Sequence, residues 1–176
     1  MPILSYLTSA FILKMIGRSI DIALTNIEAG SDMEELYENV CTLSSDPGLC
    51  FNYAETDDLK KWGFSEGCFT CLLHDKKDVF IQVIATYSDR EGANRAYNAN
   101  VDYLIKNDYG SPVKAKTLGE SSVLFKKEQS DGVAFNLIFL KNRVHAALSA
   151  KYKYDNPDNV KHILGLAEKI EGKILQ

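Results

Sequence analysis

Two cysteines stand three residues apart in the stretch GCFTCLLHD, residues 67–75, together with a histidine and an aspartate. C-x-x-C spacing occurs in redox-active dithiols and in zinc sites, where thiolates and histidines bind the metal. A metal at this position would draw on Cys68, Cys71 and His74, with Cys50 as a further candidate. The alternative is that these thiols pack in the interior as small apolar side chains.

The pattern around the two cysteines predicts a β-strand, because the side chains alternate and the polar turn HDKKD is followed by the β-branched run VFIQVIATYS. In a strand, Cys68 and Cys71 point to opposite faces, and the three residues span ~10 Å, whereas a disulfide requires Cα atoms within ~7 Å. A thioredoxin-type dithiol would instead begin a helix. We therefore expect packing thiols and no metal. A metal- or thiol-dependent protein using Cys68 and Cys71 stays open as the alternative.

The other two cysteines, Cys41 and Cys50, flank the turn SSDPG. Their separation allows a disulfide that would contribute ~2–3 kcal/mol by restricting the unfolded chain. Such a bond would indicate an oxidising compartment.

No set of titratable residues marks a catalytic site, so we predict that the protein is not an enzyme. His74 falls in a turn, His162 on the last helix and His145 in a strand. Alternation along that strand places Arg143, His145 and Ser149 on the sheet face away from the helices, which is our candidate surface for a ligand or partner. The stretch AYNANVDYL is an aromatic, amide-rich helix face that we assign to packing.

Composition and missing motifs exclude several functions. The formal charge is −4, the pI is about 5.4 and the charges are interspersed, which argues against a nucleic-acid partner. The sequence has no phosphate-binding loop, dinucleotide fingerprint or metalloprotease motif, and we expect no cofactor.

The N-terminal stretch is the most apolar part of the chain. Lys14 and Arg18 interrupt it, so we expect no transmembrane span and no export signal. This favours the cytoplasm, or an extracytoplasmic site if residue 1 is not the native start. Residues 1–27 could complete the core, form a dimer interface in a homo-oligomer, or lie on a membrane surface.

Periodicity and turn residues predict one α+β domain over residues 1–176, with an N-terminal helical segment over 1–45 and a sheet with two long helices over 46–176. The sheet is expected to be antiparallel, with helices packed on one face. The capping pair Ser31 and Glu34 predicts that a helix begins near residue 32. The expected helices cover 32–43, 88–110 and 157–174, and the expected strands cover 49–55, 67–73, 79–88, 121–128, 133–140 and 143–154.

Residues 79–174 resemble the α/β/α sandwich module of PsbP-like and LpqN-like prokaryotic surface and sensor proteins. The resemblance lies in YSDREGANRAY, TLGESSVLF, GVAFNLIFLKNRVHAALS and the closing AEKIEGKIL. It implies a binding or scaffolding subunit with no shared catalytic set. We therefore predict a non-catalytic binding or accessory module for an unknown protein or small ligand. A carrier of a small apolar ligand, with a cavity between sheet and helices, is a further alternative.

Overall fold

A seven-stranded antiparallel sheet forms the centre of the computed structural model, which describes residues 18–30, 32–45, 50–74 and 78–174. The spatial order of the strands is β1-β2-β3-β7-β6-β5-β4. The strand bounds are β1 Met33–Cys41, β2 Phe64–His74, β3 Asp78–Tyr87, β4 Ser111–Val113, β5 Ser121–Gln129, β6 Gly132–Lys141 and β7 Val144–Tyr152. The predicted α+β class with an antiparallel sheet is confirmed.

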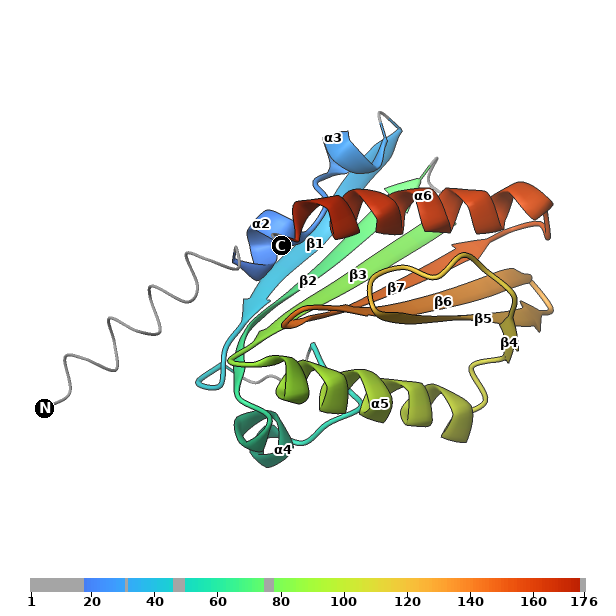
Figure 1. Cartoon of the computed structure of the whole chain (residues 1–176). Coiled ribbons are helices and arrows are strands. Elements are labelled where there is room, and N and C mark those ends of the chain that lie inside the picture. The colour runs from blue at the N-terminus through green and yellow to red at the C-terminus, as the bar shows by residue number, and fades with distance from the viewer. Residues whose placement is uncertain (1–17, 31, 46–49, 75–77, 175–176) are drawn as a thin grey trace, which may run out of the picture.

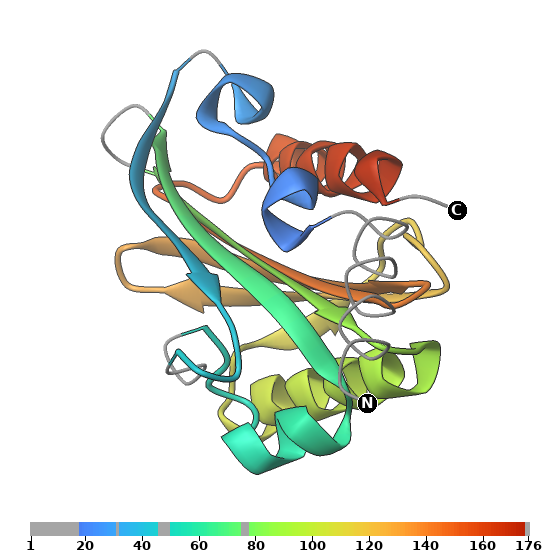
Figure 2. The ribbon, with the colours of Figure 1, turned by 90° about the vertical axis from the view of Figure 1, so that its left-hand side faces the viewer.

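Helices cover both faces of this sheet, as Figures 1 and 2 show. The long helix α6 lies on one face with the short helices α2 and α3, and the long helix α5 lies on the opposite face with α4. The helix bounds are α2 Ser19–Ile22, α3 Asn26–Ala29, α4 Thr56–Lys61, α5 Arg90–Lys106 and α6 Pro157–Lys173. Our prediction of helices on one face was wrong in this respect, because the inner strands are apolar on both faces and require cover on each.

Each long helix begins at a side chain that accepts a hydrogen bond from the backbone of its first turn. Asn156 caps α6 by accepting from the backbone N–H of Asp158, and Pro157 occupies the first turn. The cap of α5 is Asp89, which accepts from the Gly92 N–H at 2.8 Å. Both helices therefore begin within two residues of the predicted positions.

The predicted helix over 32–43 was wrong, because Met33–Cys41 forms the edge strand β1 and pairs antiparallel with β2. Residue 31, the first member of the expected capping pair, lies outside the described residues. A capping box is present earlier, between Thr25 and Glu28, where it begins α3. Long-range pairing with β2 thus outweighs a local helix signal. Residues 50–55, predicted as a strand, form a loop.

Residues 18–29 complete the core on the α6 face, one of the roles considered for the N-terminal segment. Ile22 and Leu24 are buried there, and the buried Gln82 side chain accepts from the Leu24 N–H at 2.9 Å and donates to the Leu24 carbonyl. Ser19 donates to the Glu66 carboxylate from its backbone and its hydroxyl. The dimer and membrane alternatives for residues 1–17 lie outside the described part of the chain.

Candidate binding site

The C-x-x-C pair lies in the middle of β2, and its two side chains point to opposite faces as predicted. Cys68 is buried in the core beneath α6, and Cys71 is half-buried on the α5 side. Burial raises the pKa of the Cys68 thiol to about 11 and also raises the pKa of Cys71. Both thiols therefore stay protonated and weakly nucleophilic at neutral pH.

No metal cluster forms around this pair within the described ranges, where no three His, Cys, Asp or Glu side chains lie close enough to hold an ion. His74 ends β2, and its backbone pairs with Met33 and Asp78. The structure does not describe its side chain. The alternative of a metal- or thiol-dependent protein remains untested, with this geometry against it.

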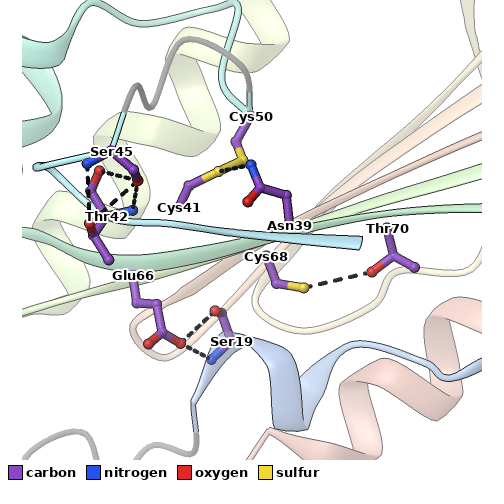
Figure 3. Close-up of a disulfide and its surroundings, with 9 residues drawn as sticks. All are labelled: Ser19, Asn39, Cys41, Thr42, Ser45, Cys50, Glu66, Cys68 and Thr70. Carbon is purple, nitrogen blue, oxygen red and sulfur yellow. Dashed lines mark hydrogen bonds between the residues drawn. A yellow bond between two sulfur atoms is a disulfide. The ribbon is translucent and has the colours of Figure 1, made fainter. Parts of the chain in front are cut away.

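A disulfide joins Cys41, the last residue of β1, to Cys50 (Figure 3). The Cα atoms are 6.7 Å apart. The bond ties the loop of residues 50–55 to the edge of the sheet. This is the pairing that the sequence left open.

The loop is also held by a buried phenylalanine. Phe51 is 1 % exposed and packs edge-to-face on Phe64, with ring centroids 5.1 Å apart. It lies over Gly67 of β2, where an added Cβ would come within 2.4 Å of the Phe51 ring. Because Gly67 has no side chain, the loop can approach the sheet closely at this point.

His145 lies at the centre of a buried polar cluster. Its Nδ1 is 3.1 Å from the Tyr53 hydroxyl and its Nε2 is 3.2 Å from Nδ2 of Asn100 on α5. Because an amide nitrogen only donates, Nε2 accepts, and the proton of the neutral ring sits on Nδ1. Burial lowers the pKa of His145 to about 3, so the ring is neutral at physiological pH.

This position contradicts our expectation of an open sheet face at Arg143, His145 and Ser149. The face carrying His145 is covered by α5 and by the loop of residues 50–55. Arg143 lies in the turn before β7 and donates to the Ser88 carbonyl at 3.0 Å. Ser149 is half-buried and donates to Asn136 at 2.7 Å. The three residues thus do not form one surface.

A pocket of about 360 Å³ lies between α5, the loop and the sheet. Its floor includes buried residues from β6, β7 and α5, and its rim carries the exposed Asn52 and the half-buried rings of Phe69 and Tyr103. Asn52 donates to the Tyr103 hydroxyl at 3.2 Å across the rim. The lining residues are Cys50, Asn52, Tyr53, Phe69, Ile81, Val83, Asn100, Tyr103, Leu104, Tyr109, Asn136, Leu137, Ile138, Ala147, Leu148 and Ser149.

The lining is apolar with a few hydrogen-bonding groups, and no described lining residue has a charged side chain. Small-molecule sites in proteins typically have this composition and a volume of ~300–1,000 Å³. A charged ligand would be desolvated here without a counter-charge, which is costly. The arrangement is suited to holding a small, uncharged molecule.

Sequence reasoning placed two residues of this pocket in candidate sites, Ser149 on the proposed binding face and Cys50 as a possible metal ligand, and missed the others. The stretch AYNANVDYL supplies Asn100, Tyr103 and Leu104, which we had assigned to packing. Its aromatic and amide side chains were the available signal. Tyr53 lies in a loop that we had predicted as a strand, and no sequence signal marked it as a pocket residue.

Comparisons with known proteins support the fold. Neither the family models nor the curated protein sequences match this chain. Among solved structures, the extracellular domain of PknH from Mycobacterium tuberculosis aligns over 89 % of this chain and 94 % of its own, with a TM-score of 0.58 and 16 % identity. A putative uncharacterized protein from Mycobacterium smegmatis aligns over 81 % and 90 %, with a TM-score of 0.36 and 11 % identity.

The likeness to the PknH domain shows a shared fold and no more at this identity. The coarser part of our resemblance, an α/β domain similar to one from a prokaryotic surface protein, agrees with it. The assignment to PsbP-like or LpqN-like proteins stays a prediction. Within the described residues, no helix is long and apolar enough to cross a membrane.

Proposed function

We propose that this chain is a non-catalytic binding domain whose ligand, a small uncharged molecule, occupies the pocket between α5 and the sheet. The observation that supports this most directly is an uncharged pocket of about 360 Å³ with an apolar floor and a few convergent amide and hydroxyl groups. This combines the predicted binding module with the predicted small-ligand carrier.

The chemistry of the nearby residues supports a non-catalytic role. A general base has a pKa near the working pH, whereas burial lowers the pKa of His145 to about 3 and both ring nitrogens face protein groups. Burial also raises the pKa of the two free thiols, Cys68 and Cys71, away from the range of reactive cysteines.

Two observations favour an extracytoplasmic location. The Cys41–Cys50 disulfide is of a kind that persists in oxidising compartments. The PknH structure, which shares the fold, is an extracellular domain. This location differs from the cytoplasm, which the sequence analysis favoured.

Binding of the uncharged fluorescent probe N-phenyl-1-naphthylamine tests the proposal. Ala147 lies on the pocket wall against Leu104 and Ile138, so Ala147→Phe fills the space. Ala134 lies on neighbouring β6, is half-buried and is not a lining residue, so Ala134→Phe is the matched control. We expect saturable binding to the wild type and the control, and at least about tenfold weaker binding to Ala147→Phe.

The smaller filler Ala147→Leu should give an intermediate loss, which guards against misfolding of the phenylalanine variant. If the wild type does not bind the probe saturably, or if all the variants bind it equally, the pocket is not a ligand site and the proposal is wrong.

A further inference from the structure

Two buried amides stand on the floor of the pocket, and each uses only one of its two polar atoms in a hydrogen bond to the protein. Asn100 is 6 % exposed and uses its Nδ2 on His145, 3.2 Å away. Asn136 is 8 % exposed and uses its Oδ1 to accept from Ser149 at 2.7 Å. The carbonyl oxygen of Asn100 and the amide nitrogen of Asn136 make no further hydrogen bond within the described part of the chain.

These two groups are open to the pocket. Among the described residues, the one fully enclosed side-chain nitrogen or oxygen without an aligned hydrogen bond is the Tyr87 hydroxyl. The free halves of Asn100 and Asn136 are therefore reached from the pocket, since both residues line it. Polar groups in such a position seek a partner, because leaving them unpaired costs free energy.

Strand register gives the separation between the two amides along the floor. Asn136 pairs with Ser149 on β7, and Asn100 contacts His145, four residues earlier on the same strand. At ~3.3 Å per residue along β7, the positions that contact the two amides lie roughly 13 Å apart. Between them the wall is apolar, with Ala147 and Ile138 at its middle.

We propose that the pocket binds an elongated, uncharged ligand with a hydrogen-bond donor at one end, an acceptor at the other and an apolar body between them. Asn100 Oδ1 accepts from the donor, and Asn136 Nδ2 donates to the acceptor. This inference rests on the proposed function and names the ligand class for the same pocket. Linear molecules with a terminal amide or hydroxyl at each end belong to this class.

Matched pairs of amides provide the test. Suberamide has an amide at each end of an alkyl chain, whereas octanamide has the same chain length and one amide. Their binding is followed by ¹H–¹⁵N spectra, because ligand contacts shift the signals of the side-chain NH₂ groups of Asn100 and Asn136. We expect suberamide to bind about tenfold more tightly than octanamide, the value of one further hydrogen bond in a desolvated site.

Substitution of one amide should remove this advantage. Asn136→Leu keeps the side-chain shape and removes the donor, so it should reduce suberamide binding to the octanamide level. Asn98→Leu, which changes an exposed residue of α5 outside the pocket, is the matched control and should keep the tenfold preference. The control should bind N-phenyl-1-naphthylamine as the wild type does, and Asn136→Leu should still bind this probe saturably.

The outcomes separate the two proposals. If the fluorescent probe binds but suberamide shows no preference over octanamide, or if Asn136→Leu leaves the preference intact, the two-ended ligand is wrong and the binding pocket stands. If the wild type does not bind the probe, or if Ala147→Phe binds it as the wild type does, the proposed function itself is wrong.

Discussion

The hydroxyl of Tyr53 lies 3.1 Å from Nδ1 of His145, although the two residues are 92 positions apart in the chain. The rings also pack edge-to-face, with centroids 5.4 Å apart. This contact joins an irregular loop to a central strand. It holds one wall of the pocket, because Tyr53 lines the pocket and His145 lies behind it.

Removing this hydroxyl should loosen the loop. Tyr53→Phe keeps the ring and leaves the buried Nδ1 without its partner, so the free energy of unfolding should fall by about 1–3 kcal/mol. Urea unfolding measures it. Tyr154 is 70 % exposed, and Tyr154→Phe should change stability by less than about 0.5 kcal/mol. Equal effects of the two substitutions would mean that the contact does not contribute to stability.

The buried histidine should make stability depend on pH. Its folded pKa is about 3, below its ordinary value of 6.5, so the unfolded state binds more protons between these values. The free energy of unfolding therefore decreases as pH falls through this window, and His145 contributes up to about 1.4 kcal/mol per pH unit to this decrease. Above pH 6.5 its contribution should be constant.

Urea unfolding across that window in the wild type and in His145→Gln isolates this effect, because glutamine does not titrate. Carboxylates with lowered pKa, such as Asp21 and Glu28, act in the same direction and are present in both proteins. The slope should be smaller in the variant. Parallel curves for the two proteins would show that His145 is not held neutral by burial.

Breaking the disulfide should destabilise the protein. The bond closes a loop with a sequence separation of nine, and the double substitution Cys41→Ala/Cys50→Ala should cost about 2–3 kcal/mol. Thermal and urea unfolding measure the loss. Cys71→Ala, which changes a free, half-buried thiol, is the matched control and should cost less than about 1 kcal/mol.

Intact mass of the purified protein provides an independent check of the same bond. The native chain should lack two hydrogen atoms relative to the reduced chain, and reductant should restore them. A fully reduced native protein would contradict the pairing and remove one of the two arguments for an extracytoplasmic location.

A side chain at Gly67 should displace the loop. In Gly67→Ala the new methyl group would meet the Phe51 ring, so we expect a loss of about 1–3 kcal/mol and weaker binding of the fluorescent probe. Gly172 in α6 has open space around it, and Gly172→Ala should instead stabilise the protein by roughly 0.5–1 kcal/mol. Unchanged stability and binding in Gly67→Ala would show that the loop adapts freely.

Local patterns in the sequence predicted the hairpin of β2 and β3, the strands from residue 121 to 154 and the two long helices. These elements depend on neighbours in the chain, since alternation, caps and turn residues act over a few positions. The opposite orientation of Cys68 and Cys71 followed from the same rule. The strand β1 did not, because its partner β2 lies beyond a loop and a helix, and pairing outweighed the local pattern around Glu34.

Local sequence patterns could not predict the candidate site. The sequence by itself determined the residue types, the two amides on a helix and a strand, and a permitted disulfide between Cys41 and Cys50. The tertiary structure alone decided that α5 covers the face of His145, that Tyr53 reaches that histidine and that an uncharged pocket remains between them. Its walls come from α5, the two loops that carry Tyr53 and Tyr109, and four strands, and such contacts form when the whole sheet assembles.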